Sequence, residues 1–180
     1  MIVDAGANVG AASLWFALHF PDASIFALEP DKDSAQICRQ NCAKLCHVVV
    51  IEGAIGGRPG KVVVDRAGQS WAFQTRRVED KSGIQLYTVA DILAMAGPRA
   101  RLLIVKVDIE GFEADLFAHN TEWTGNTPVI FVEPHDWLLP GKKTSQSMQR
   151  ALMGRGFELI LIGENLTFVR ESLELPSLSH

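Results

Sequence analysis

The sequence predicts an α/β protein built on a mostly parallel β-sheet. Short apolar runs alternate with helical segments from the first residues onward, and these runs lack the polar alternation of a half-exposed strand. The first five segments, in order, are 2–4, 11–20, 24–29, 34–45 and 48–52. A strand–helix–strand–helix–strand order favours parallel strands joined by right-handed crossovers, with helices on both faces of the sheet.

Length and composition indicate one domain without a nucleic-acid or membrane partner. The chain has 180 residues and a formal net charge of −4, which gives no basic footprint for DNA or RNA. No apolar run is long enough to span a bilayer, and the acid and glycines at positions 4–10 exclude a signal peptide, so a cytoplasmic protein is expected. We expect the domain to cover 1–172, followed by a loose tail at 173–180.

The stretch from Val3 to Gly10 has the form strand, glycine turn, helix, which is typical of nucleotide-binding proteins. A dinucleotide fingerprint carries three glycines that serve a pyrophosphate, whereas no glycine lies between Gly6 and Gly10 here. Asp4 is awkward for a pyrophosphate but suits a cationic amine. The pattern therefore favours S-adenosylmethionine (SAM), which has an amine and a sulfonium but no phosphate, over a dinucleotide or a plain glycine turn. Gly6 is expected to allow close approach to the ligand, and Gly10 close packing of the helix on the strand.

Acids follow four predicted strands, and parallel strands bring such ends to one edge of the sheet. They are Asp4, Glu29, Asp108 and Glu133. Four converging carboxylates need cations or hydrogen-bond donors, which indicates a ligand site. Glu29 lies about twenty residues past the glycine loop, where an acid accepts both hydroxyls of a ribose in NAD or SAM. Ala54 and Ile55 are expected beside the adenine, with ordinary turn packing as the alternative.

The stretch 53–97 interrupts the alternating plan as a β-hairpin excursion. We expect strands at 61–65 and 71–75, an extended piece at 85–89, and a short helix at 89–96 that Thr88 caps and Gly97 ends. Excursions on a rigid α/β scaffold often carry specificity. Beyond it, helices are expected at 113–119 and 145–153, and a terminal hairpin at 157–162 and 165–169.

No metal site is predicted. Cys38, Cys42 and Cys46 recur every fourth residue, which places them along one stripe of a helix rather than around a tetrahedral ion. They are expected to pack against the sheet as small apolar residues. No other His, Cys and Asp cluster has the spacing of metal ligands.

Three blocks of the sequence resemble the FkbM family of SAM-dependent methyltransferases. They are the stretch 3–10, the stretch Ala27-Leu28-Glu29-Pro30, and the motif K-x-D-x-E-G-x-E at 106–113. The resemblance implies the Rossmann-like class I methyltransferase fold, a three-layer sandwich with a mostly parallel seven-stranded sheet and an antiparallel last strand. Family members usually carry segments before the first strand, so the site of this chain is expected to be open on that side.

The same resemblance implies roles for individual residues. Gly6, Asn8 and Gly10 would shape the cofactor loop, and Asp4 would lie near the methionine amine, directly or through water. Glu29 would hold the ribose with Pro30 beside it, and Asp108 would face the methionyl end and the acceptor. Candidates for the base are Asp108, His135 and Glu110.

The expected activity is O-methylation of a hydroxyl on a sugar, polyketide-like or other small natural-product acceptor, with SAM as cofactor. One alternative is a methyltransferase-like module that binds SAM or a partner without turnover. An NAD-dependent oxidoreductase is a weaker alternative, because the third glycine is missing. The sequence leaves open the identity of the acceptor and whether the chain forms a homo-oligomer.

Overall fold

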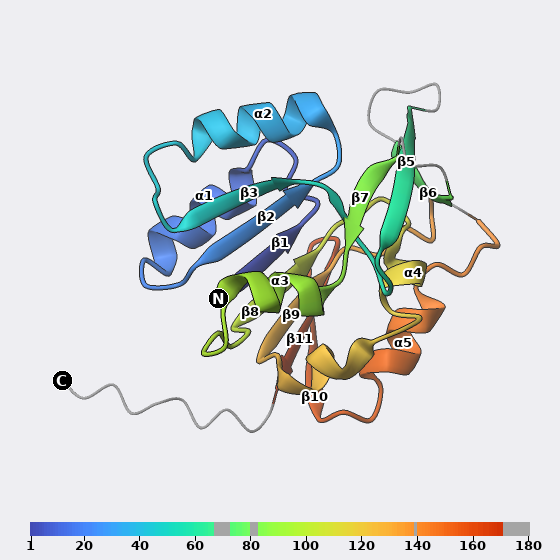
Figure 1. The fold of residues 1–180 in the computed structure, drawn as a ribbon. Coiled ribbons are helices and arrows are strands. Elements are labelled where there is room, and N and C mark those ends of the chain that lie inside the picture. The colour runs from blue at the N-terminus through green and yellow to red at the C-terminus, as the bar shows by residue number, and fades with distance from the viewer. Residues whose placement is uncertain (67–72, 80–82, 139, 171–180) are drawn as a thin grey trace.

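The computed structural model describes residues 1–66, 73–79, 83–138 and 140–170, and its centre is a seven-stranded β-sheet (Figure 1). The strand order is β10-β11-β9-β8-β1-β2-β3. The strands are β1 (Ile2–Ala5), β2 (Ile25–Glu29), β3 (Val48–Glu52), β8 (Ile104–Val107), β9 (Val129–Val132), β10 (Phe157–Ile162) and β11 (Asn165–Arg170). Only β11 runs against its neighbours. The predicted α/β class, the mostly parallel seven-stranded sheet and the antiparallel last strand are confirmed.

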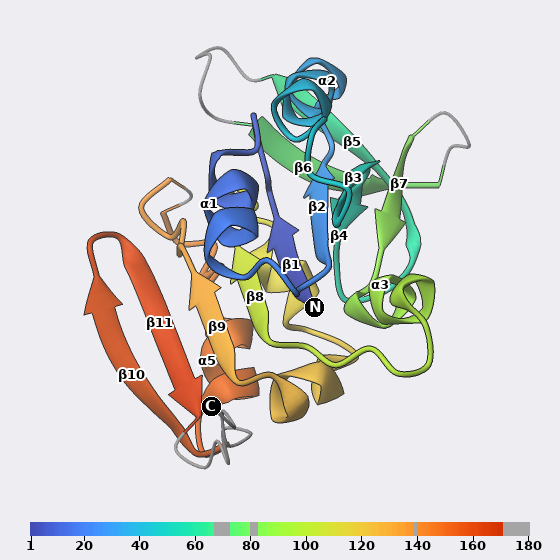
Figure 2. The same ribbon diagram turned by 90° about the vertical axis from the view of Figure 1, so that its left-hand side faces the viewer.

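Helices cover both faces of this sheet (Figure 2). On one face lie α1 (Ala11–His19) and α2 (Lys32–Asn41); on the other lie α3 (Val89–Ala96), α4 (Glu113–Leu116), the 3₁₀ helix η1 (Thr121–Asn126) and α5 (Gln146–Leu152). Successive strand residues point to opposite faces. Ile2 therefore packs in one cluster with Phe16 of α1, while the adjacent Val3 packs in another with Ile92 of α3.

A second, four-stranded sheet stands at the carboxyl ends of the first (Figure 1). Its order is β4 (Ala54–Ile55), β7 (Ile84–Tyr87), β5 (Gly60–Arg66) and β6 (Phe73–Val78). The expected hairpin is the antiparallel pair of β5 and β6, and β4 and β7 extend it into a sheet. Residues 71 and 72 of the predicted second strand lie outside the described residues, as does the tail at 173–180.

Local capping explains where two helices begin. Asp31 caps α2, since its Oδ1 accepts a hydrogen bond from the Ser34 backbone N–H at 3.3 Å, and α2 begins two residues earlier than predicted. Thr88 caps α3 in a reciprocal capping box with Asp91, as expected.

The expected packing of the cysteines holds for two of them. Cys38 and Cys42 are buried beside Ala7 and Ala27. Cys46 is exposed because α2 ends at Asn41, before the predicted helix end, so the prediction is wrong for this residue. Among the described residues, no helix is long and apolar enough to cross a membrane.

Both loop glycines allow close packing, and for Gly10 the partner differs from the expected strand. A Cβ on Gly6, which has φ +78°, would lie 1.7 Å from the carbonyl oxygen of Asp108. A Cβ on Gly10 would lie 2.7 Å from Sγ of Cys38. Gly6 thus lets the end of β1 approach the end of β8, and Gly10 lets the start of α1 contact α2 instead of a strand.

Gly6→Ala should lower the free energy of unfolding by more than about 3 kcal/mol, since overpacking and a left-handed backbone both oppose the new Cβ. Gly154→Ala is the matched control: Gly154 has φ +73° but no atom within 4 Å of its Cβ position. The control should lose only about 1 kcal/mol, the cost of the left-handed backbone. Urea denaturation measures both, and equal losses would contradict the close approach of β1 and β8.

Candidate functional site

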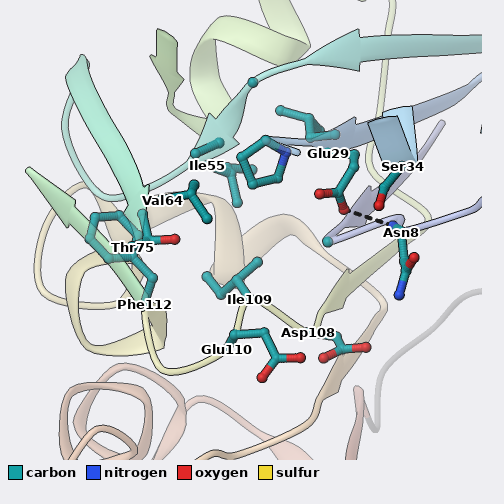
Figure 3. Close-up of a pocket in the computed structure, with 15 residues that line it drawn as sticks. Asn8, Glu29, Ser34, Ile55, Val64, Thr75, Asp108, Ile109, Glu110 and Phe112 are labelled. Atoms are coloured by element: carbon teal, nitrogen blue, oxygen red, sulfur yellow. Dashed lines mark hydrogen bonds between the residues drawn. The ribbon is translucent and has the colours of Figure 1, made fainter. Parts of the chain in front are cut away.

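A cavity of about 410 Å³ lies between the carboxyl ends of the central strands and the second sheet (Figure 3). Its size lies within the range of small-molecule sites. The predicted site residues that line it are Gly6, Asn8, Glu29, Pro30, Ala54, Ile55, Asp108 and Glu110. Gly10, Asp4 and His135 do not line it.

Glu29 presents a fixed hydrogen-bond acceptor to this cavity. Its Oε2 accepts from the backbone N–H of Asn8 at 2.8 Å (Figure 3). Its Oε1 accepts from the backbone N–H of Asp31, also at 2.8 Å. Burial raises the pKa of Glu29, and these two hydrogen bonds oppose the rise. Each carboxylate oxygen has a second lone pair for a ligand donor. The carboxylate is therefore oriented before any ligand binds.

Apolar side chains make the opposite wall of the cavity. The second sheet contributes Ile55 from β4, Val64 from β5 and the hydroxyl-bearing Thr75 from β6, and Phe112 precedes α4. In Figure 3 these residues lie across the cavity from Glu29 and Asn8. The excursion thus supplies part of the cavity, which suits a ligand with one polar end and one flat apolar end.

Asp4 is paired inside the protein and is not available for a direct contact with a ligand amine. It is fully buried, Ser13 Oγ donates to its Oδ2 at 2.6 Å, and the Lys106 ammonium lies 3.4 Å from its Oδ1. Asp4 and Lys106 are paired residues of β1 and β8. A direct contact of Asp4 with a cofactor amine does not agree with this burial, and Lys106 supplies a cation for the carboxylate. An approach through water stays a prediction.

Lys106 also contacts Asp108, with Nζ 3.3 Å from Oδ2. Burial lowers the pKa of Lys106, but Asp4 and Asp108 outweigh it and raise the pKa above the usual value. The lysine is thus charged and bridges the ends of two strands. In the sequence, the position of Lys106 inside the apolar run 102–107 indicates this pairing, because a lysine in a buried strand needs a buried partner.

His135 lies behind the cavity at the centre of a group of carboxylates. Its Nδ1 is 2.9 Å from Oε1 of Glu113, and both side chains are almost fully buried. Its Nε2 lies 3.6–3.9 Å from oxygens of three further acids: Asp108, Glu110 and Glu133. Burial lowers the pKa of His135, but the hydrogen bond and charge of Glu113 and the charges of the other acids raise it to about 9.

Glu113 is the residue of this group whose role could not be predicted from the sequence. Its Oε1 lies 3.2 Å from the Gly111 N–H and 3.4 Å from the Ile109 N–H, in addition to the His135 contact. The residue fixes both the turn after β8 and the histidine after β9. No local spacing shows this, because Glu113 and His135 are 22 residues apart.

Asp115 of α4 connects the second sheet to the rest of the domain. It accepts from Arg77 Nη2 at 2.7 Å and from Arg77 Nε at 2.5 Å, and the backbone N–H of Gly57 donates to it at 3.0 Å. The hydrogen bond from Asp115 raises the pKa of Arg77. This bidentate pair holds β6, and so Thr75, over the cavity.

The strand order and the cavity at the carboxyl ends define the Rossmann-like fold of methyltransferases. No protein-family model matches the chain. The chain is similar to the 2-O-methyltransferase NoeI of Sinorhizobium fredii, with 25% identity in an alignment of 155 residues that covers 76% of this chain and 63% of NoeI. It thus spans less than two thirds of the length of that relative.

Two solved structures share the fold. One is a proposed O-methyltransferase from Klebsiella pneumoniae, with a TM-score of 0.55 and 14% identity over 94% of this chain and 72% of that chain. The other is precorrin-6y C5,15-methyltransferase from Geobacter metallireducens, with a TM-score of 0.51 and 14% identity over 94% of this chain and 79% of that chain. At these identities the likeness shows the fold alone.

Lys106→Met should lower the free energy of unfolding by about 3–5 kcal/mol, because it leaves the buried Asp4 carboxylate without its cation. Adding Asp4→Asn to this variant should restore part of the loss. Arg39→Met is the control, since Arg39 pairs with Glu52 at 3.5 Å on the surface, and its loss should stay below about 1 kcal/mol. Chemical denaturation of the four proteins tests the pairing, and a double variant less stable than Lys106→Met would contradict it.

Proposed function

We propose that the chain is a SAM-dependent O-methyltransferase of the FkbM type that methylates a hydroxyl of a sugar or another small natural-product acceptor. The observation that carries the proposal is the Glu29 carboxylate, which two backbone N–H groups orient at the wall of a cavity of suitable size. The resemblance of the motifs at 3–10, 27–30 and 106–113 to that family supports it, as does the similarity to a 2-O-methyltransferase.

The residues of the cavity fit a nucleoside bearing a positively charged side chain. Glu29 would accept hydrogen bonds from the ribose hydroxyls, while Ile55 and Phe112 would pack against the adenine. Asp108, which is paired with Lys106, would contribute negative charge near the methionyl end of the cofactor. Bound SAM would supply a methyl group already activated on a sulfonium, so that the protein mainly aligns donor and acceptor.

Loss of the hydroxyl proton is the remaining chemical requirement. Asp108 and Glu110 both line the cavity, and their carboxylates are directed towards each other in Figure 3. His135 is 2% exposed and lies behind them, so a direct contact with the acceptor would need the cluster to open. Because Asp108 is paired with Lys106, we assign the role of base to Glu110.

Glu29→Ala should weaken binding of S-adenosylhomocysteine by about 10–100-fold in calorimetry, since it removes hydrogen bonds to a charged acceptor. Glu52→Ala is the matched control: Glu52 pairs with Glu29 in register at the end of β3, but it does not line the cavity. It should bind like the parent.

Affinity should also depend on pH through Glu29. The ribose hydroxyls donate to the ionised carboxylate, whose pKa is raised by burial. Lowering the pH from about 7 to about 5 should therefore weaken binding in the parent as the carboxylate takes up its proton. Glu29→Gln should show a flatter profile. Equal affinity of Glu29→Ala and the parent at neutral pH would remove Glu29 from the ribose site.

Turnover tests the enzymatic part of the proposal. The chain should convert SAM to S-adenosylhomocysteine in the presence of an acceptor from a panel of methyl glycosides and hydroxylated small molecules. Glu110→Gln should lower the rate by about 10²–10⁴-fold, the usual contribution of a positioned base, with little change in S-adenosylhomocysteine affinity. Glu158→Gln, on the exposed face of β10, is the control. Tight cofactor binding without turnover on any acceptor would instead favour a non-catalytic SAM-binding module.

A further inference from the structure

We propose that Asp108, Glu133 and His135 bind a divalent metal ion of the Mn²⁺ or Zn²⁺ kind where β8 and β9 end. The three side chains each offer one ligand atom, and these atoms all lie within 4.8 Å of one another. The sequence predicted no metal because the residues come from the ends of two strands and have no local motif. The role of the ion in holding an acceptor hydroxyl rests on the proposed function; its binding does not.

The backbone fixes the two carboxylates side by side. Asp108 and Glu133 directly follow the neighbouring parallel strands β8 and β9, and the Glu133 N–H donates to the Val107 carbonyl at 2.9 Å. His135 Nε2 lies 3.8 Å from Oδ1 of Asp108 and 3.9 Å from Oε1 of Glu133. Two ligands of one ion at bond lengths of about 2.1 Å are roughly 3.0–3.7 Å apart. Small side-chain rotations therefore suffice to close the site.

The imidazole is held as a metal ligand would be. Ligating histidines commonly direct their other ring nitrogen to a carboxylate, which fixes the tautomer and the ring orientation. Here Nδ1 meets Glu113 at 2.9 Å, and Glu113 is itself held by the turn after β8. Nε2 is directed at three carboxylates at 3.6–3.9 Å, distances longer than a hydrogen bond. A bound ion would take the place of the proton on this nitrogen, which belongs to a side chain that is 2% exposed.

The local charge also calls for a cation. Five carboxylates, those of Asp4, Asp108, Glu110, Glu113 and Glu133, surround Lys106 and His135. Even with both of these side chains charged, negative charge remains in excess in a partly buried place. A divalent ion would offset this excess of negative charge.

The donor set indicates the kind of ion and its use. Two carboxylate oxygens with one imidazole nitrogen suit Mn²⁺ or Zn²⁺ better than Mg²⁺, which prefers oxygen ligands and retained waters. Three protein ligands leave positions open for an acceptor oxygen. An ion there would lower the pKa of an acceptor hydroxyl, and Glu110, on the cavity side of the cluster, would accept the proton.

Mn²⁺ alone, titrated into the full chain and followed by the electron paramagnetic resonance signal of the free ion, tests the site. We expect saturable one-to-one binding that Zn²⁺ displaces. Glu133→Gln should weaken it by at least about tenfold, since a ligand is lost. Glu158→Gln should bind Mn²⁺ like the parent. His135→Gln is a second ligand variant, and thermal unfolding identifies any variant that has lost its fold.

The inference is overturned if neither Mn²⁺ nor Zn²⁺ binds below about 1 mM, or if folded Glu133→Gln and His135→Gln both bind Mn²⁺ like the parent. S-adenosylhomocysteine binding, measured separately in the presence of EDTA, keeps the two proposals apart. Cofactor binding without Mn²⁺ binding would remove the metal site and leave the proposed function. Mn²⁺ binding without cofactor binding would leave the metal site and remove the proposed function.

Discussion

The pairing of the partly buried Lys106 ammonium group with two carboxylates is the interaction on which the site depends. Asp4 lies in β1 and Asp108 directly follows the neighbouring strand β8, and the cation between them offsets the repulsion of their negative charges. Lys106 lies 3.4 Å from one and 3.3 Å from the other, and Ser13 completes the bonding of Asp4 from α1. The same contacts hold the ends of β1 and β8 together, where Gly6 leaves room for the Asp108 carbonyl. The arrangement of the strand ends beside the cavity thus depends on the charge of Lys106 within β8.

Most of the central fold could be predicted from the sequence, because its signals are local. Unbroken apolar runs mark buried strands, Asp31 and Thr88 cap the helices that follow them, and the turn at Gly163 joins the terminal hairpin. What could not be predicted depends on contacts between distant segments. Cys46 is exposed because α2 ends before it. The pairing of β4 with β7 joins residues about thirty positions apart, and the spacing of residues along the chain does not indicate such a contact.

The candidate site likewise has a part that could be predicted from the sequence and a part that could not. Glu29 and the loop at 6–8 were predictable because a strand end, a glycine turn and a helix start are consecutive in the chain, and the structure places them around one cavity. The partner of Asp4 could not be predicted in this way, because Lys106 lies opposite it on a strand about a hundred residues away. The cluster around His135 combines residues from two strand ends and a short helix, and only the folded chain brings them together.

The single turn of α4 carries two contacts with different partners. Glu113 holds His135, while Asp115, two residues on, holds Arg77 and Gly57 of the second sheet. The second sheet is therefore anchored to the same short helix that orients the histidine. An exchange of this sheet between proteins of the same fold would therefore have to keep Arg77 of β6 and Gly57, which follows β4. Without these two residues the sheet would lose its anchor over the cavity, and the partly buried Asp115 carboxylate would be left unpaired.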